Sequence, residues 1–574
     1  LMIGSEGTLG FIGEITYKTV KEDPFKASSL MIFSDNQTAG RAGSRLKSEP
    51  VAAVELMDRA GLKSMEHSDG VPSYLKGLSP EACSLLVQTS ADSHEQLHEQ
   101  IEIITKALDD VPTEMPITFT DKPAEYNKFW KIRKGLYPSV GAMRKTGTTV
   151  IIEDVAFPVE KIAEAIGALQ ELFSKYEYNE TVIFGHALEG NLHFVFSQAF
   201  DNQYEIDRYE KFMDELAVLV TEGYDGSLKS EHGTGRNMAP YVEKEWGVEA
   251  YEMMKRIKAV FDPQDLLNPG VILNNDPKVH LKNLKPMPAA HEVIDKCTEC
   301  GFCEPACVSH GLTLSPRQRI TVYREMQRLK ETGEQPELLA SLEKDYDYKG
   351  LQTCATDGLC AVACPVGINT GTLVKYLRRE NLGKPEKALA ATIAPNMDKV
   401  SGLTRFGLTA VDGVHKVIGT KAMHMIATGM RNVSGKNLPQ WDPFLPKGAP
   451  KIDTSVPVNG NPRKVVYFPS CINQAFGVSV DYDEKIALTG KVKQLLTKAG
   501  YEIIYPENLS SQCCGMPCSS KGFTDQSMSK SNQLEQALLK ASENGKYPVL
   551  SDMSPCFQSM SENIGEPLRI YDPV

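Results

Sequence analysis

The chain has 574 residues, of which 41% are hydrophobic and 24% are charged, so its composition is that of ordinary globular protein and its length calls for several domains. The formal net charge of −12 argues against a nucleic-acid partner, because contact with phosphates requires a basic surface. No apolar run approaches the roughly 18 residues that a membrane-spanning helix needs. We expect a soluble multidomain α+β protein that contacts a membrane, if at all, only at its surface.

The sequence of the first 280 residues predicts the C-terminal end of one domain and a complete second domain. Residues 1–20 read as a glycine-rich turn followed by a strand over Phe11–Val20, and we expect them to be the end of a domain that is truncated. Residues 21–280 mix strand-like runs with amphipathic helical stretches, which indicates an α+β domain. The expected strands are Ser84–Gln88, Thr149–Val155 and Leu192–Phe196, and the expected helices are His94–Leu108, Val159–Phe173 and Gln203–Val220.

Three further regions follow along the chain. Residues 285–380 hold two cysteine groups on either side of a helical insert, Ile320–Lys344. Residues 381–460 form a helical connector that is comparatively basic, with eight basic and two acidic residues between Lys399 and Lys451. Residues 461–574 predict an α/β domain from the strand Val465–Phe468, the helix Lys485–Ala499 and the strand Glu502–Tyr505. We expect the chain to be a piece of a longer protein, truncated at both ends.

The 13 cysteines are distributed unevenly, with Cys83 alone in the first half and twelve between Cys297 and Cys556. Tight cysteine groups in a long acidic chain indicate metal ligation in a reducing compartment, and therefore a cytoplasmic location, rather than disulfides. The run Cys297, Cys300, Cys303 and Cys307 has the spacing that holds a 4Fe–4S cluster. Structural zinc is the alternative, but zinc sites usually separate two CxxC pairs widely.

The second cysteine group departs from this spacing at one position. It consists of Cys354, Cys360 and Cys364, and Asp357 stands where a fourth cysteine is expected. In two-cluster ferredoxins the last cysteine of each run ligates the other cluster. We therefore expect Cys297, Cys300, Cys303 and Cys364 to hold one cluster and Cys307, Cys354 and Cys360 to hold the other. Asp357 is then a fourth ligand, the neighbour of a 3Fe–4S cluster, or only a loop residue.

A third group comprises Cys471, the adjacent pair Cys513 and Cys514, and Cys556, with Cys518 nearby. Adjacent cysteines rarely form a disulfide with each other, so such a pair binds a metal or remains as thiols. The spacing resembles the cysteine-rich domain named for its CCG motif, which is found in heterodisulfide reductases and in glycolate oxidase iron–sulfur subunits. That resemblance implies a further iron–sulfur centre or a redox thiol site.

Four residues in the first half form a second kind of metal-competent pattern. His186 and His193 lie seven residues apart around a turn, and Glu231 and His232 follow in a glycine-containing loop. Each histidine alone is more often a satisfied structural residue. Together, two neutral imidazoles and a carboxylate suit a divalent ion such as zinc or manganese.

Several motifs in the first half resemble the vanillyl-alcohol-oxidase-type flavoproteins, namely GSEGTLGFIGEIT, WKIR, IEDVAFP, GHALEGNLH, SEHGTGRNMAP and FDPQDLLNPG. The order of oxidase, ferredoxin and CCG regions resembles the large fused FAD-binding and iron–sulfur D-lactate dehydrogenases of respiring bacteria. The resemblance implies that His186, His193 and Glu231 bind a metal that holds the substrate, that His232 is the general base, and that Arg133 pairs with the substrate carboxylate. It also implies that FAD is contacted by Ser5, Glu6, Gly7, Thr8 and Asn268.

The implied activity is the oxidation of a D-2-hydroxy acid, with D-lactate giving pyruvate, on FAD, and transfer of the electrons through clusters to a quinone or cytochrome. Glycolate and D-2-hydroxyglutarate are alternative substrates, and an electron-carrier module with an inert oxidase half is an alternative of another class. A third, weaker alternative is a heterodisulfide-reductase-type thiol function for the CCG region. Two positions depart from the family pattern: Glu189 replaces the usual Asp, and Ile152 stands near where 2-hydroxyglutarate relatives carry a Lys. The second departure favours a small substrate. The resemblance also implies that residues 1–20 are the C-terminal end of a truncated FAD-binding domain, so we expect the piece alone to lack FAD and activity. We interpret the basic helical stretch Lys399–Lys451 as a solvated connector, with docking on an anionic membrane surface as the alternative.

Overall fold

The computed structural model describes residues 2–66, 71–435, 438, 440–454, 463–479 and 482–573. The chain divides into two compact units, which we describe separately. The first comprises Leu1–Tyr346 and Leu359–Thr370, and the second comprises Asp347–Gly358 and Gly371–Val574.

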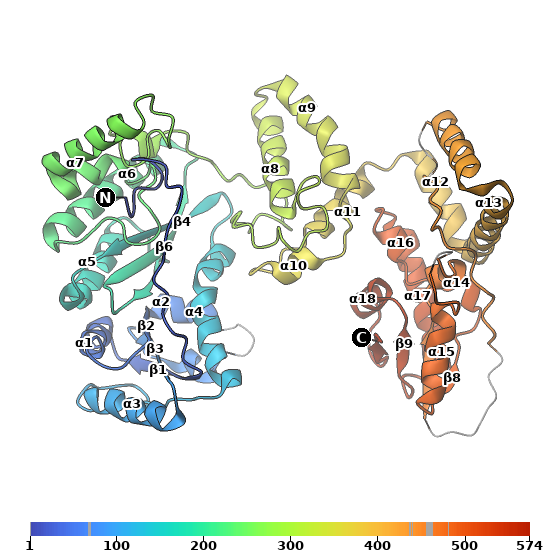
Figure 1. Cartoon of the computed structure of the whole chain (residues 1–574), viewed down its shortest axis with the longest axis horizontal. Coiled ribbons are helices and arrows are strands. Elements are labelled where there is room, and N and C mark those ends of the chain that lie inside the picture. Colours follow the sequence, from blue (N-terminus) through green and yellow to red (C-terminus); the bar gives the residue numbers. More distant parts are fainter. Residues whose placement is uncertain are drawn as a thin grey trace. The chain divides into compact units, whose positions relative to one another are not determined.

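The first unit is built around a six-stranded sheet with the order β1-β3-β2-β5-β6-β4, in which each neighbouring pair is antiparallel (Figure 1, blue to green). The expected strands are confirmed and extend one or more residues beyond the predicted bounds. Their bounds are β1 Phe25–Phe33, β2 Ala53–Met57, β3 Cys83–Ala91, β4 Thr148–Ala156, β5 Val182–His186 and β6 Asn191–Ala199.

Helices cover both faces of this sheet, and the alternation of side chains along each strand divides the core in two. On β6, Phe194 and Phe196 enter one hydrophobic cluster, while Val195 enters the other. The helices α1 (Asn36–Leu46), α5 (Ile162–Lys175) and α6 (Gln203–Val218) pack into the first cluster. The helices α2 (Arg59–Met65) and α4 (Pro123–Met143) pack into the second, and α3 (His94–Ala107) contacts β1 and β3. The predicted helices in this region are thereby confirmed.

One predicted strand is wrong. Residues 11–20 form no strand, and Phe11, Tyr17 and Val20 are 84%, 79% and 91% exposed. A strand is stable only when its backbone pairs with a neighbour. No strand in the described part of the chain pairs with this segment, so its alternating apolar residues are not supported by the backbone hydrogen bonds of a sheet.

The helical insert between the cysteine groups consists of two helices rather than one. The helix α8 (Pro316–Thr332) begins at a capping box made by Ser315 and Gln318, and ends at Gly333, whose φ of +69° suits glycine. The helix α9 (Pro336–Tyr346) then packs against α8. The short helix α10 (Leu359–Ala363) follows Cys354, the first cysteine of the second group.

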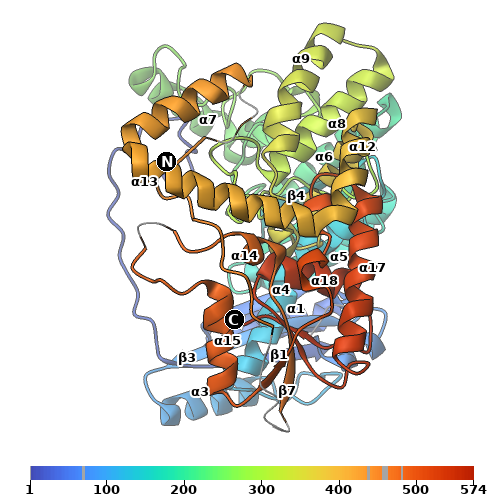
Figure 2. The same cartoon turned by 90° about the vertical axis from the view of Figure 1, so that its right-hand side faces the viewer.

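The second unit contains a four-stranded parallel sheet with the order β10-β9-β7-β8, which confirms the predicted α/β region. Its strands are β7 Lys464–Phe468, β8 Glu502–Ile504, β9 Val549–Ser551 and β10 Ile570–Tyr571. Its helices are α11 Thr370–Glu380, α12 Lys384–Ile393, α13 Met397–Val433, α14 Cys471–Ala475, α15 Leu488–Lys498, α16 Met516–Ser519, α17 Thr524–Ala541 and α18 Ser554–Asn563 (Figure 2). None of the helices described is both long enough and apolar enough to cross a membrane.

The helix α7 (Val242–Phe261) of the first unit and α13 of the second each contain one break. Gly247 has φ and ψ of 79° and 161°, and Gly419 has 76° and 168°. These values lie in a region that residues other than glycine rarely adopt, so each break occurs where the sequence permits it.

Candidate active site

The motif GHALEGNLH forms the hairpin between β5 and β6, which sets the spacing of its two histidines. His186 is paired with Asn191, and Phe184 is paired with His193. Because residues two apart on a strand share a face, both imidazoles lie on the same side of the sheet, with ring centroids 5.4 Å apart. The turn is tight: Gly190 has a φ of +70°, and an added Cβ there would lie 1.9 Å from the carbonyl oxygen of Phe157.

Asp154 places the loop that carries Glu231 and His232. Asp154 lies on β4 directly opposite His193, and its side chain is buried. Its Oδ2 accepts hydrogen bonds from the backbone N–H groups of both Glu231, at 2.5 Å, and His232, at 3.0 Å. One buried carboxylate thus fixes the backbone of both predicted site residues.

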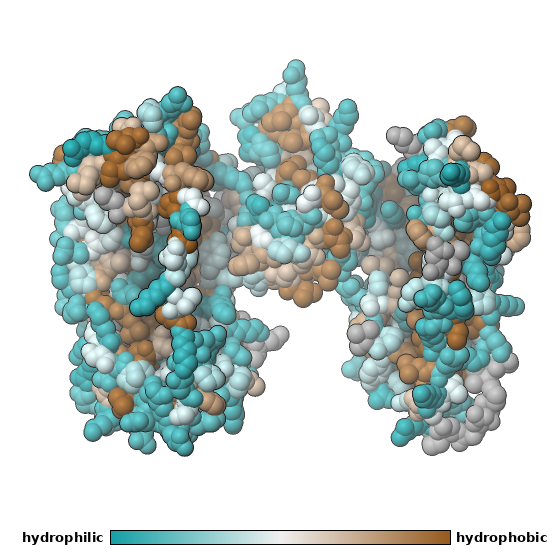
Figure 3. Space-filling model, viewed as in Figure 1, coloured by the Kyte–Doolittle hydropathy of each residue, from teal (hydrophilic) through white to brown (hydrophobic). Residues whose placement is uncertain are grey.

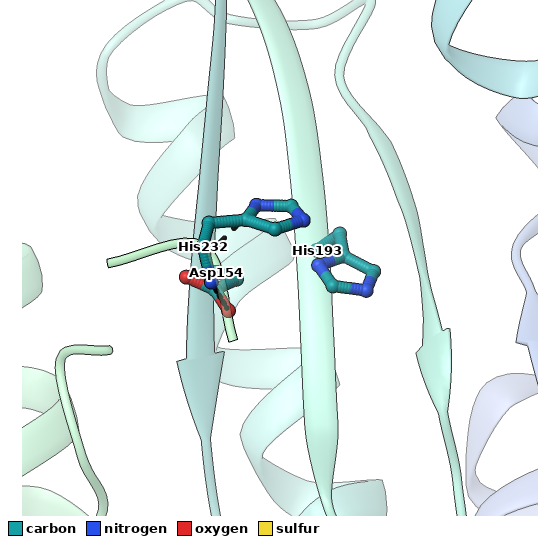
Figure 4. A group of neighbouring side chains, drawn as sticks. All are labelled: Asp154, His193 and His232. Carbon is teal, nitrogen blue, oxygen red and sulfur yellow. Dashed lines mark hydrogen bonds and ion pairs between the residues drawn. The ribbon is translucent and has the colours of Figure 1, made fainter. Parts of the chain in front are cut away.

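Three imidazoles converge on the carboxylate of Glu231. Its Oε1 lies 3.1 Å from Nε2 of His186, 3.1 Å from Nε2 of His193 and 3.8 Å from Nε2 of His232. The rings of His193 and His232 are stacked, with centroids 4.6 Å apart and planes 14° from parallel. Figure 4 shows this stack together with Asp154, whose Oδ1 lies 4.0 Å from Nδ1 of His232.

The donor set fits a divalent metal. His186, His193 and Glu231 form one group whose ligand atoms all lie within 4.8 Å of one another, and Asp154, His193 and His232 form a second. Burial, followed by the nearby His232 and Arg133, lowers the pKa of His193 to about 4. The ring is therefore neutral near pH 7, as a metal ligand must be, and two imidazoles with a carboxylate suit zinc or manganese.

Glu55 is a site residue that our sequence interpretation missed. It lies on β2 opposite His186, is 6% exposed, and its Oε1 lies 2.8 Å from Nδ1 of His186. Its Oε2 accepts a 2.7 Å hydrogen bond from Nε of Arg133 on α4. Burial alone would raise the pKa of Glu55, but His186 and Arg133 outweigh it and lower the pKa below its usual range. The available signal was a lone carboxylate inside the apolar strand AVELM.

Arg133 lies close to the histidines, because it shares Glu55 as a partner with His186. Besides its bond to Glu55, its guanidinium lies 4.4 Å from the centroid of the Phe184 ring, two residues before His186 on β5. The ion pair is largely buried, with side-chain exposures of 15% for Arg133 and 7% for Glu55. The cation and the imidazoles therefore flank the same end of β5.

The residues predicted to contact FAD are held against the same loop. Glu6 accepts hydrogen bonds from the backbone N–H groups of Thr234 and Gly235 and from Lys229. Burial opposes ionisation of Glu6, but these donors prevail and lower its pKa. Asn268 Nδ2 donates to the carbonyl oxygen of Glu6 at 2.7 Å. The remaining predicted contacts, Ser5, Gly7 and Thr8, adjoin Glu6, and both Ser5 and Thr8 are buried.

Four cysteines of the first unit line one cavity, namely Cys297, Cys300, Cys303 and Cys364. These are the four expected to share a cluster. Burial and the neighbouring thiols raise the pKa of Cys303 to about 12, so thiolates here require a bound cation. Cys307 does not line this cavity: it lies 3.1 Å from Oγ of Ser309 and 3.7 Å from Nη1 of the buried Arg319. Although burial opposes the effect, these two partners lower the pKa of Cys307.

The other predicted cluster ligands are divided between the units: Cys360 belongs to the first, and Cys354 and Asp357 to the second. Within the second unit, Arg378 on α11 donates to the carbonyl oxygen of Cys354 at 2.8 Å and to that of Ser520. Ser520 follows the CCG motif by a few residues. One guanidinium therefore joins the loop of Cys354 to the loop that follows the CCG motif.

The CCG thiols meet at the carboxyl ends of parallel strands. Cys471 follows β7, Cys513 and Cys514 follow β8, and Cys556 follows β9. Cys514 and Cys556 have their sulfur atoms 3.2 Å apart, and Cys513 is hydrogen-bonded to both Cys471 and Cys514. The hydrogen bond from Cys471, the larger effect, and that from Cys514 lower the pKa of Cys513. The half-buried Cys518 and the buried Lys530 lie close enough to Cys513 for their charges to interact with that of its thiolate.

Comparison with known proteins agrees with this arrangement. Residues 23–272 match the family of FAD linked oxidases, C-terminal domain, and residues 293–368 match the 4Fe-4S dicluster domain. Residues 23–272 therefore resemble the C-terminal domain of FAD linked oxidases, and residues 293–368 resemble a 4Fe-4S dicluster domain. These two matches agree with the resemblance of the sequence motifs to the fused flavin and iron–sulfur D-lactate dehydrogenases.

Several curated proteins resemble the first half of the chain. It is 32% identical over 281 residues to the mitochondrial D-lactate dehydrogenase [cytochrome] of Arabidopsis thaliana, covering 48% of this chain and 47% of that protein. It is 29% identical over 282 residues to the glycolate oxidase subunit GlcD of Bacillus subtilis, covering 48% and 57%. It is also 29% identical over 282 residues to a D-lactate dehydrogenase of Anaerostipes hadrus, covering 47% and 57%. The chain spans about half the length of the curated relatives it matches.

Proposed function

We propose that the whole protein oxidises a D-2-hydroxy acid on FAD and passes the electrons through its iron–sulfur clusters to a respiratory acceptor. D-lactate, which gives pyruvate, is the substrate we favour. The convergence of three imidazoles on Glu231, beside the paired Arg133, is the observation that carries this proposal. In this proposal the proton acceptor His232, the metal-competent donor set and the cation Arg133 all lie near one end of β5.

Each residue has a distinct role in this proposal. Arg133 binds the substrate carboxylate, for which a planar guanidinium with several donors is suited. His232 accepts the hydroxyl proton at Nε2, and its ring is held for that task by the stack on His193 and by the backbone bond to Asp154. His186, His193 and Glu231 would hold a zinc or manganese ion, which when bound makes a coordinated hydroxyl more acidic.

The choice of D-lactate over larger substrates rests on Ile152. This residue lies on β4 two positions before Asp154, and therefore on the same face of the sheet as the site. An apolar side chain here offers no partner to a second carboxylate, which D-2-hydroxyglutarate carries and D-lactate and glycolate lack. Between D-lactate and glycolate we favour D-lactate, and relatives of both kinds resemble this chain.

The clusters supply the exit route for the electrons. A hydride transfer delivers two electrons together, whereas iron–sulfur clusters accept one at a time, so a flavin fused to two clusters couples the two kinds of step. The acceptor is then a quinone or a cytochrome, and the protein works in the cytoplasm at the inner face of the membrane. The CCG thiols would hold a further iron–sulfur centre on this route.

Anaerobic mixing of the full-length protein with D-lactate tests the proposal, with the flavin and clusters followed by visible and electron paramagnetic resonance spectroscopy. Bleaching of the flavin together with signals of reduced clusters supports it. Reduction by dithionite alone, with no effect of D-lactate, glycolate or D-2-hydroxyglutarate, would contradict it and favour an electron-carrier module. Removal of the divalent metal by a chelator should abolish reduction by D-lactate, while reduction by dithionite stays intact.

A further inference from the structure

The helix α13 turns an apolar side away from the unit to which it belongs. Leu403, Phe406 and Val417 are 73%, 72% and 85% exposed. With Ala410 and Val414 they recur at spacings of three and four residues, so they lie along one side of the helix. None of the residues of this helix is buried.

The opposite side of α13 faces the protein and holds both apolar and polar side chains, among them the half-buried Leu408 and Val411. Asp412 is 10% exposed and accepts a 2.7 Å hydrogen bond from Lys416. The ring of His415 lies 4.9 Å from that of Trp441, and Gly448 lies so near that an added Cβ would be 2.5 Å from Oγ1 of Thr409. A helix on a globular protein normally leaves its polar side exposed, so a second apolar side that is open to solvent indicates a surface for contact with another apolar phase.

The apolar surface continues past the break at Gly419. In the second segment of α13, Met425, Met430 and Val433 are 70%, 57% and 90% exposed. Apolar residues gather over α13 at the right-hand edge of the view in Figure 3, and the bend of the helix is visible in Figure 2.

The charges on α13 identify what covers this surface. The helix carries five basic residues and two acidic ones, although the whole chain has a net charge of −12. The basic residues are Lys399, Arg405, Lys416, Lys421 and Arg431, and the acidic ones are Asp398 and Asp412. Two copies of the chain packed through this helix would bring these like charges together, which is unfavourable. An anionic phospholipid surface instead attracts lysine and arginine while it accepts the apolar side chains.

We propose that α13 lies in the surface of an anionic phospholipid bilayer, with the side of Leu403, Phe406 and Val417 between the headgroups and the acyl chains. The inference rests on the proposed function only in one respect: that function explains why the protein would bind a membrane, since a quinone acceptor is dissolved in the bilayer. Binding itself is measured without turnover, so its failure and the failure of the dehydrogenase assignment are distinguishable.

Co-sedimentation of the full-length protein with vesicles tests the proposal. Vesicles that contain phosphatidylglycerol should bind the protein, vesicles of phosphatidylcholine alone should bind it weakly, and added salt should reduce the binding to the former. The triple variant Leu403→Asp, Phe406→Asp and Val417→Asp should bind the anionic vesicles at least about tenfold more weakly. Because these side chains are exposed, circular dichroism and cluster absorbance should not change.

A matched control changes exposed apolar residues elsewhere. The variant Val248→Asp with Val260→Asp alters α7, where these side chains are 63% and 76% exposed, and should bind vesicles like the parent. Equal binding by the parent and the triple variant, or no binding to anionic vesicles, would overturn the proposal. So would a concentration-dependent dimer of the parent that the triple variant does not form, because the surface would then belong to a second copy.

Discussion

Glu55 lies directly opposite His186 on adjacent strands, with its Oε1 2.8 Å from Nδ1 of the imidazole, while its Oε2 binds Arg133 at 2.7 Å. Because a carboxylate only accepts hydrogen bonds, Nδ1–H of His186 donates to Glu55, and Nε2, which lies 3.1 Å from Oε1 of Glu231, is the nitrogen that would bind a metal. Glu55 thus orients both His186, a proposed metal ligand, and Arg133, the proposed partner of the substrate carboxylate.

We expect Glu55→Gln to weaken divalent-metal binding by about 10- to 100-fold, because the amide holds the imidazole less strongly and removes the charge that balances Arg133. Competition with a fluorescent chelator would measure the affinity of the full-length protein. Glu189→Gln, in the exposed turn of the same hairpin, is the matched control and should leave it unchanged. Equal affinities for all three proteins would show that Glu55 is only structural.

Gly190→Ala should destabilise the first unit by about 2 kcal/mol or more, since the new Cβ would meet the Phe157 carbonyl and the φ of +70° disfavours alanine. Gly167→Ala on α5 is the control, because nothing lies within 4 Å of its added Cβ and alanine favours a helix. Thermal unfolding should show a lower midpoint for the first variant and an unchanged or higher one for the second. A midpoint for Gly190→Ala equal to that of the parent would mean that the hairpin relaxes freely.

Ile152→Lys should raise the ratio of kcat/KM for D-2-hydroxyglutarate over D-lactate by about tenfold or more, because the new ammonium group can pair with the second carboxylate. Ile152→Leu keeps the site apolar and should preserve the parent's preference. Steady-state kinetics of the full-length protein with both acids would measure the ratio. A lysine variant that loses activity on both acids equally would argue against a specificity role for this position.

Asp58 should make the first unit less stable as the pH rises. It is 3% exposed, and burial raises its pKa from 3.8 to about 7, even though Gly61 and Ile183 donate backbone N–H groups to it. Between these values the folded state retains a proton that the unfolded state has lost, so the free energy of unfolding falls as the pH rises from about 4 to about 7. Cys83 is a buried thiol nearby, and burial followed by Asp58 raises its pKa, so it stays neutral throughout this range.

Denaturant unfolding at pH 5 and pH 7.5 would measure this dependence. Asp58→Asn should be less stable at pH 5, because the amide cannot accept both backbone hydrogen bonds, but its stability should change less between the two pH values. A pH dependence that is identical in the two proteins would assign the effect to other groups.

Arg378→Ala should loosen the loop of Cys354, because it removes the donor to the carbonyl oxygens of both Cys354 and Ser520. We expect faster loss of iron from the cluster that Cys354 is predicted to ligate, measured as chelator-accessible iron over time. Arg379→Ala, the adjacent change on α11, is the control. Equal rates of iron loss in both variants would show that the guanidinium does not protect the cluster.

The sequence predicted those parts of the fold that local patterns specify. Strand-like runs predicted β3, β4 and β6, and the helical insert Ile320–Lys344 predicted the region of α8 and α9. The pattern over Phe11–Val20 failed because a strand also requires a pairing partner, which no local pattern reveals. Gly333 divided the predicted insert into two helices, a break that its sequence context allowed but did not require.

The sequence predicted the site residues that lie in short motifs. It missed those whose place in the site depends on the order of strands in the sheet. His186, His193, Glu231 and His232 were found from two motifs, and the structure brings all four together. Glu55 was missed because its role depends on β2 pairing with β5, strands that are far apart in the sequence. The two roles of Asp154, opposite His193 and beneath the loop of His232, likewise follow only from the pairing of β4 with β6.

The hairpin between β5 and β6 restricts how this protein can diverge. Side chains alternate between the two faces of a strand, so one residue inserted between His186 and His193 would shift the register and turn His193 toward the aromatic core of Phe194 and Phe196. A chain whose hairpin differs by one residue in this way would lose the convergence of His186 and His193 on Glu231 even if all three residues were retained. The number of residues in this turn is therefore constrained together with the identities of the two histidines.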